Sequence, residues 1–316
     1  MDDLRISQLP DLELTVLVGA FAGWNDAGSA ATWAVKFLVN HWDAVEFGDL
    51  EPDSFYEFTE ARPQVRISGG AIRQFSWPST RFYYHRAERD ETGHQLGRDV
   101  VLLIGEEPQL RWRAFGRAVG ELCQRCHVED VVLLGALAAE VPHTAPVKVS
   151  GVATRGAALR HLTRAEVEPA NYEGPTGIVG ALQEMSRRAG LTTTSLWGVA
   201  PHYVAATPNL PVAEALLRKL DQIEGFDLRL HDLSRAARRF NQRVSSLVAE
   251  DAEVSAYVRE LERRTSAPTG ARDEVDADER APSSRAATTG ELPSPEEAVR
   301  DVEAWLRDFR KRMGAE

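Results

Sequence analysis

The chain has 316 residues, of which 43% are hydrophobic and 27% are charged, a composition typical of a globular protein with a sizeable core. Its formal net charge of −11 argues against a nucleic-acid-binding protein, because phosphate contacts require a basic surface. Residues 1–5 lack the pattern of a signal peptide, and the apolar run at residues 128–141 contains acids and is too short to span a bilayer. We therefore expect a cytoplasmic protein that binds neither membrane nor nucleic acid.

The first predicted elements are a strand and a helix joined by a glycine-bounded turn. Residues 14–20 form a short, branched, apolar run that is typical of a buried strand. Residues 30–42 carry apolar side chains at helical spacing. The turn between them, at residues 21–29, lies where α/β proteins usually keep their functional residues.

This turn does not fit a phosphate-binding P-loop. Gly23 and Gly28 have the spacing of that loop, but Ser29 stands where lysine is needed. Asp26 would also place negative charge where an anionic phosphate binds. We expect instead that Asn25 or Asp26 caps the following helix and that the two glycines adopt unusual backbone angles.

A strand is expected at residues 44–47, followed by a hairpin-rich insert over residues 56–85. Apolar and polar residues alternate in the insert, and Gly69, Gly70 and Pro78 interrupt the runs. This pattern predicts hairpins with one solvated face.

The next segment has the order strand, helix, strand. Residues 100–105 and 131–135 are continuous apolar runs, and residues 110–127 between them have a helical pattern. Such a unit requires a right-handed crossover and a largely parallel sheet.

Both cysteines lie at the end of this predicted helix. Cys123, Cys126 and His127 spell a c-type haem attachment motif, but attachment requires export and no export signal is present. A structural zinc site needs four ligands, and the chain has no second pair of cysteines. We expect free thiols on the apolar side of the helix, with no metal and no cofactor.

Strands and helices continue to alternate to residue 226. Strands are expected at residues 147–152 and 192–199, and helices at residues 178–188 and 211–223. The sequence therefore predicts a three-layer α/β/α domain at residues 1–226 with a mixed, largely parallel sheet.

The C-terminal part of the chain is predicted to be helical and then irregular. Residues 227–265 carry a helix-packing stripe and should form a helical hairpin packed on the α/β domain. Residues 266–293 lack aromatic residues and are rich in charged and small residues, which predicts a disordered acidic linker. Residues 294–313 begin with helix-capping residues and have one apolar face, so we expect a helix that docks on its own chain or on a partner.

Acids and histidines follow several predicted strands or precede predicted helices. If the strands are parallel, these side chains converge on the carboxyl edge of the sheet, where an acid–base or metal site could form. The opposing interpretation is that such residues cap helices and contact water, and Trp24 is a pocket wall or, more often, a core residue. No Gly-x-Ser-x-Gly motif marks a nucleophile. The candidate pocket residues are Trp24, Asn25, Asp26, Glu106, His143, Glu173, Thr176 and His202.

Four stretches together resemble the proteasome assembly chaperone family in its bacterial and archaeal branch. They read GWNDAG at residues 23–28, EPQLRWR at 107–113, VPHT at 141–144 and EGPTGI at 173–178, the last accompanied by residues 197–203. The four stretches keep the family's order, and the resemblance covers residues 14–264, nearest to actinobacterial members.

The resemblance implies an α/β fold similar to nucleoside phosphorylases and related hydrolases. It also implies a homo-oligomer, with a trimer as one candidate, and a proteasome-related protein partner, but no established reaction. Some relatives finish in a hydrophobic–Tyr–any-residue tail that enters pockets on the proteasome ring. This chain ends in RMGAE, so the resemblance does not extend to that mode of docking.

Three functional hypotheses follow from the sequence. The first is a non-catalytic, oligomeric protein-interaction or assembly factor, because no complete catalytic set is visible. The alternative is a nucleoside- or phosphate-binding protein, or a hydrolase- or phosphorylase-like enzyme, that uses the carboxyl edge of the sheet. The third is a scaffold that polymerises or docks through the helix at residues 294–313.

Overall fold

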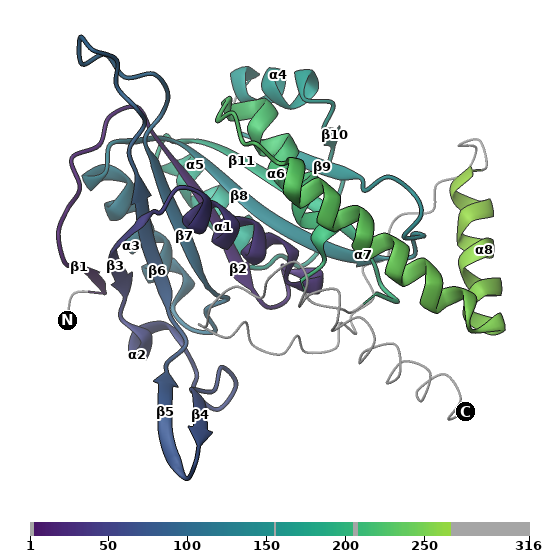
Figure 1. Cartoon of the computed structure of the whole chain (residues 1–316). Helices are drawn as coiled ribbons and strands as arrows, with labels where there is room; N and C mark the ends of the chain where they lie inside the picture. Colours follow the sequence, from purple (N-terminus) through teal and green to yellow (C-terminus); the bar gives the residue numbers. More distant parts are fainter. Residues whose placement is uncertain (1–2, 155, 205–207, 267–316) are drawn as a thin grey trace.

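The structure is a computed structural model, which describes residues 3–154, 156–204 and 208–266. The linker predicted at residues 266–293 lies outside the described residues except for Ser266, and the helix predicted at residues 294–313 lies wholly outside them. Within the described part, strands and helices are interspersed along the chain up to β11 (Thr192–Pro201), and the last three elements are helices (Figure 1).

The centre of the molecule is a nine-stranded mixed sheet, which confirms the predicted fold class. Four consecutive strands of this sheet run parallel, and three antiparallel strands continue it on one side. The order across the sheet is β1 (Leu4–Ile6), β3 (Val45–Leu50), β6 (Thr80–His85), β7 (Val100–Glu106), β2 (Thr15–Ala22), β8 (Val128–Ala139), β11 (Thr192–Pro201), β9 (Val149–Ala153) and β10 (Glu168–Pro169).

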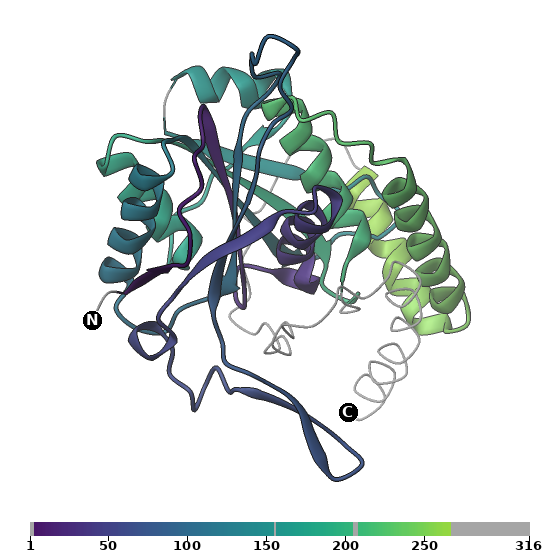
Figure 2. The same cartoon turned by 60° about the vertical axis from the view of Figure 1, so that its left-hand side comes forward.

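Helices cover both faces of the sheet, as Figures 1 and 2 show. All eight residues of β2 are buried, because its side chains point alternately into two apolar layers. One layer contains α1 (Ala30–His41), α4 (Gly156–Arg164), α6 (Leu210–Glu224), α7 (His231–Ala249) and α8 (Ala252–Ser266). The other contains α2 (Pro52–Phe55), α3 (Trp112–Arg125) and α5 (Ile178–Arg188).

The C-terminal helices belong to the first layer. The stripe of α7 that includes Leu233, Phe240 and Val244 is buried, and α7 packs on α6. Val254 and Val258 of α8 join the same apolar cluster. The helical hairpin therefore extends the core on one face of the sheet.

The strand–helix–strand segment has the predicted parallel strands, but a third strand lies between them. β7 and β8 are parallel, as the strand–helix–strand pattern requires, but β2 lies between them and pairs with both. Sequence-adjacent strands are thus not neighbours at the centre of the sheet. Helix α3 starts at Trp112, because Arg111 has a left-handed φ of 52° and ends the preceding loop.

The thiols of Cys123 and Cys126 are free and buried, as expected. Burial raises the pKa of both thiols, because a thiolate loses its hydration in an apolar layer. These side chains are core residues of α3 and its C-terminal end.

Two local expectations need correction. Trp24 is 44% exposed and is therefore not a core residue. The insert does contain a hairpin, but β4 (Gln64–Ser68) and β5 (Ala71–Ser76) form a separate two-stranded sheet, and only β6 joins the main sheet. The hairpin extends away from the body in both views (Figures 1 and 2).

Candidate functional site

The loops after β2 and β7 meet the start of α5 through the carboxylate of Glu107. Its Oε1 accepts a hydrogen bond from Asn25 Nδ2 at 2.7 Å and another from the backbone N–H of Ile178 at 2.8 Å. Ile178 is the first residue of α5, so Glu107 satisfies an otherwise unpaired helix donor and places negative charge at the positive end of the helix. Three of the four signature stretches therefore converge at one point.

Glycines allow this close approach. A Cβ added at Gly177 would lie 2.4 Å from the amide of Asn25 and 2.6 Å from Oε1 of Glu107, which is closer than atoms can pack. Gly23 has a φ of +121°, and a Cβ there would lie 3.3 Å from Cβ of Glu107. The signature glycines are needed because Asn25 and Glu107 occupy the space that a side chain would fill.

Asp26 caps helix α1 with its side chain. Its Oδ1 accepts from the N–H of Ala31 at 2.6 Å, and its Oδ2 accepts from the N–H of Thr32 at 3.2 Å and from the Thr32 hydroxyl. Burial raises the pKa of Asp26 to about 6, although these hydrogen bonds oppose the shift. Gly28 has a φ of 61°, so both glycines of the turn adopt the unusual backbone angles that the sequence predicts.

A half-buried ammonium group lies near Asp26. Burial lowers the pKa of Lys36 on α1, while the charges of Asp26 and Glu106 oppose that shift. Burial raises the pKa of Glu106, the last residue of β7, and Lys36 opposes it. We call Asp26, Lys36 and Glu106 the acidic–lysine group.

The adjacent carboxylates Glu106 and Glu107 serve different faces of the sheet. Glu106 interacts with Lys36 on the α1 side, whereas Glu107 binds Asn25 and Ile178 on the α5 side. Successive side chains of a strand point to opposite faces, and the pair follows that rule at the end of β7. The two acids therefore do not form a catalytic dyad.

His143 connects the loop after β8 to the C-terminal helices. Its Nδ1 lies 2.7 Å from the hydroxyl of Tyr203, which also accepts from the His143 backbone N–H at 2.7 Å. Its Nε2 lies 2.9 Å from Oγ of Ser245 on α7. The neighbouring Thr144 donates to Glu262 on α8 at 2.6 Å. Burial lowers the pKa of His143, because the charged imidazolium is penalised in this position.

His202 has a similar role at the end of β11. Its Nδ1 lies 3.2 Å from the carbonyl oxygen of Ala139, and its Nε2 lies 3.2 Å from the hydroxyl of Tyr257 on α8. Rings of Tyr203 and Tyr257 stand edge-on to the His202 ring. Both histidines thus contact the helices that follow the α/β domain.

The remaining candidates lie on the surface. Glu173 and Thr176 are exposed, and the Tyr172 hydroxyl closes their loop by donating to the carbonyl oxygen of Pro175 at 2.7 Å. Thr176 contacts only its own neighbourhood through a 3.5 Å approach to the carbonyl oxygen of Gly177. Trp24 is also exposed beside the Asn25–Glu107 contact.

Several participants were not among the predicted candidates. Glu107 follows the same predicted strand as Glu106, and both Glu107 and Gly177 lie in signature stretches, so the sequence places them near the site without marking their contacts. Lys36, Ser245 and Tyr257 lie on helices without a motif, so nothing local in the sequence marks them.

The chemistry available at these positions is limited. In the described part of the chain, no group of three or more histidines, cysteines or acids is arranged to hold a metal ion. None of the described helices is long and apolar enough to cross a bilayer. Nδ2 of Asn25, the carboxylate of Asp26 and both ring nitrogens of His143 are engaged in contacts that position loops and helices, whereas Oδ1 of Asn25 is buried without a hydrogen-bond partner among the described residues.

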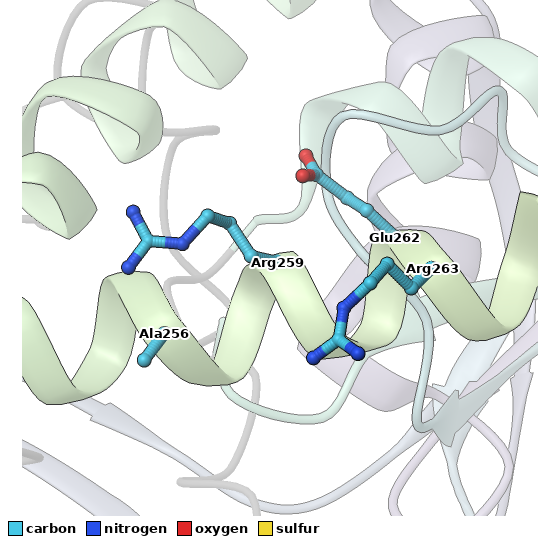
Figure 3. A pocket seen from close by; sticks show the side chains of 4 residues that line it. All are labelled: Ala256, Arg259, Glu262 and Arg263. Carbon is cyan, nitrogen blue, oxygen red and sulfur yellow. The ribbon is translucent and has the colours of Figure 1, made fainter.

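A separate hollow lies along α8, and Figure 3 shows the side chains that line it. Its volume is about 510 Å³, and its lining in the described residues consists of Ala256, Arg259, Glu262 and Arg263. All four side chains come from one helix, and the hollow does not include the carboxyl-edge candidates.

Comparisons with known proteins assign the family. The PAC2 family model matches residues 20–248. A PAC2 family protein of Streptomyces avermitilis is 40% identical, with a TM-score of 0.68, over 77% of this chain and 99% of that chain. The proteasome-assembly chaperone homologue of Mycobacterium tuberculosis is 37% identical, with the same TM-score and the same coverage.

More distant structures share the fold. An archaeal proteasome activator of Pyrococcus furiosus is 17% identical, with a TM-score of 0.60, over 78% of this chain and 99% of that chain. A comparison with curated proteins finds no match. The family model covers most of the chain, and three of the four signature stretches it spans meet at the Asn25–Glu107 contact. The chain belongs to the PAC2 family, whose members include proteasome assembly chaperone homologues.

Proposed function

We propose that this protein is a non-catalytic, oligomeric protein-interaction factor that acts in the assembly of other proteins. The proposal rests on the family of the protein and on the structural contacts that its signature residues make. Relatives include a proteasome-assembly chaperone homologue and, at fold level, an archaeal proteasome activator. A proteasome particle or its subunits are therefore the partner to test first.

The observation that carries the proposal is the engagement of the signature polar groups. Glu107 binds Asn25 and the start of α5, and His143 binds Tyr203 and Ser245. A catalytic base must reach a substrate proton, and a nucleophile needs an adjacent base. In this protein the same groups stabilise loops and dock the C-terminal helices, which suits a rigid body that presents surfaces to partners.

Purification of the tagged chain from its native cells under mild conditions tests the proposal. We expect proteasome subunits, or another defined set of assembly intermediates, to co-purify in fixed stoichiometry and to be absent from a tag-only control. Light scattering on the purified protein should give a mass above that of one chain. Recovery of no protein partner, together with a monomeric mass, would contradict the proposal.

A second candidate function is small-molecule binding, and the acidic–lysine group favours it. Burial raises the pKa of Asp26 and Glu106 and lowers the pKa of Lys36, so that the neutral form of each group is favoured. Such shifts also occur at binding and catalytic sites. A nucleoside or phosphate ligand would be expected to raise the melting temperature of the protein. A thermal-shift screen of nucleosides, nucleotides and inorganic phosphate tests this, with Lys36→Met as the variant that should lose any response.

A further inference from the structure

The β4–β5 hairpin has no part of the main sheet beside it. Among the described residues, its two strands pair only with each other, and they are joined by Gly69 and Gly70, whose positive φ angles suit a tight hairpin turn. Figures 1 and 2 show the hairpin standing away from the helices and the central sheet. An isolated two-stranded hairpin is only marginally stable in water, so a contact with another surface would stabilise this one.

One face of the hairpin is entirely apolar near its tip. Val65 is paired with Phe75, and Ile67 is paired with Ile72, so the members of each pair lie on the same face. The register shift in the ladder leaves Arg73 unpaired and brings Ile72 and Phe75 onto one face. Ile67 is 62% exposed and Ile72 is 65% exposed.

The apolar face continues toward the base of the hairpin. The ring of Trp77 lies 5.4 Å from the ring of Phe75 and 4.8 Å from the ring of Phe58. Both Phe75 and Trp77 remain about half exposed. A contiguous exposed apolar strip flanked by polar residues is characteristic of a protein-interaction surface.

The hairpin carries the opposite charge from the rest of the chain. Residues 61–80 contain Arg62, Arg66 and Arg73 and no acid, which gives a charge of +3. The whole chain has a formal charge of −11, so the other residues sum to −14. Two hairpins packed against each other would bring six arginines together, which disfavours a symmetric contact between hairpins.

An acidic and partly apolar surface lies at the amino ends of the parallel strands. Arg98 there is surrounded by three carboxylates, at 2.7 Å from Asp130, 2.9 Å from Glu224 and 3.8 Å from Glu129. One guanidinium cannot neutralise three carboxylates, so this edge keeps an excess of negative charge.

Exposed leucines border these carboxylates. Arg98 donates to the backbone carbonyl of Leu14 at 3.1 Å, and Leu14 and Leu96 are 54% and 63% exposed. We call Leu14, Leu96, Glu129 and Asp130 the acidic edge, beneath which the side chain of Glu224 is buried.

The hairpin and the acidic edge of one molecule are at opposite ends of the sheet. Thr80, the first residue of β6 after the hairpin, pairs with Gly105 near the carboxyl end of β7. The acidic edge lies at the amino ends, where β2 and β8 begin. The two surfaces therefore cannot meet within one chain, but they can meet between two chains arranged head to tail.

We propose that the apolar face of the β4–β5 hairpin docks on the acidic edge of a second copy of this chain. The inference rests on the oligomeric state proposed above and adds the interface that builds it. Ile67, Ile72 and Phe75 supply the apolar contact, and the positive charge of residues 61–80 is complementary to the carboxylates. Because the contact is head to tail, it produces a closed ring or an open chain of copies.

Light scattering on the full chain at tens of micromolar tests the apolar contact. We expect the wild type to be a multimer, Ile67→Thr/Ile72→Thr to have the mass of one chain, and Gln64→Thr/Ser68→Thr on the opposite face to match the wild type. Threonine keeps the strand preference of isoleucine, and the hairpin is outside the core, so the melting temperature should change little. A multimeric wild type with an equally multimeric Ile67→Thr/Ile72→Thr variant overturns the inference while leaving the proposed oligomer intact. A monomeric wild type overturns the inference and the oligomeric state together, whereas recovery of proteasome subunits reports separately on the assembly role.

A charge exchange tests the location of the second surface. Arg66→Glu/Arg73→Glu should raise the dissociation constant of the multimer at least tenfold, and addition of Glu129→Arg to that variant should recover part of the loss. An unchanged dissociation constant in the arginine variant, or no recovery on adding Glu129→Arg, overturns the assignment of the acidic edge.

Discussion

Replacement of Glu107 by alanine should destabilise the whole α/β body, although the residue is at the surface end of a strand. The change removes two hydrogen bonds to a carboxylate, one from Asn25 and one from the first N–H of α5. A hydrogen bond to a charged group contributes about 1.5–3 kcal/mol, and partial solvent exposure reduces that contribution. Asn25 is fully buried, so its amide would lose its partner without gaining water. We expect a loss of about 3 kcal/mol in the free energy of unfolding.

Urea unfolding followed by circular dichroism at pH 7 measures this loss, and thermal unfolding should show a decrease of roughly 6–12 °C in Tm for a domain of this size. Glu106→Ala is the matched control, because Glu106 is the adjacent carboxylate but interacts with Lys36 on the opposite face. The control should lose less than about 1 kcal/mol. A Glu107→Ala protein within about 0.5 kcal/mol of wild type would refute the structural role assigned to this carboxylate, because that is the range of ordinary surface substitutions.

The free energy of unfolding of the Gly177→Ala variant should be lower by about 1–3 kcal/mol, because the new methyl group meets Asn25 and Glu107. Gly120 in α3 has open space around it, so Gly120→Ala should be neutral or slightly stabilising in the same urea titration. Equal effects at the two glycines would contradict the close-packing explanation. Cys123 and Cys126 should react slowly with a thiol reagent in the native protein, since both thiols are buried and have raised pKa values. In urea, two equivalents of reagent should react per chain. A fast reaction of the native protein would place the thiols at the surface. Because the pKa of His143 is lowered in the folded protein, the unfolded chain binds more protons at acidic pH. The free energy of unfolding should therefore fall as the pH drops below about 6.5, with a slope of at most about 1.4 kcal/mol per pH unit. The His143→Asn variant should lack this part of the pH dependence. A wild type and a His143→Asn variant with parallel profiles between pH 7.5 and 5 would exclude this contribution.

The central strands could be predicted because burial leaves a direct mark on the sequence. β2, β7 and β8 are covered on both faces, and each contains a continuous apolar run. The order of those strands could not be predicted, since insertion of β2 between β7 and β8 depends on pairing between distant segments. The hairpin shows the same limit, because alternation marks one apolar face but does not specify what that face contacts.

The candidate residues show a related limit. Asp26 could be predicted as a cap because its partners, Ala31 and Thr32, are only a few residues away. The partner of Asn25 is 82 residues away, and His143 reaches Ser245 across 102 residues. Such contacts are determined by the tertiary fold, so local spacing identifies the polar residues without identifying the atoms they bind.

A family signature usually suggests a reaction, but the location of these residues supports another reason for their pattern. Asn25, Glu107 and Gly177 come from three separated stretches and meet at one packing contact, where each depends on the size or hydrogen bonding of the others. Their identity would thus be restricted by the fold even if the protein bound no small molecule. The β4–β5 hairpin, in contrast, has apolar side chains that the packing of the described residues leaves exposed. Surfaces of that kind, more than the signature turn, are where the specific partner of this protein should be sought.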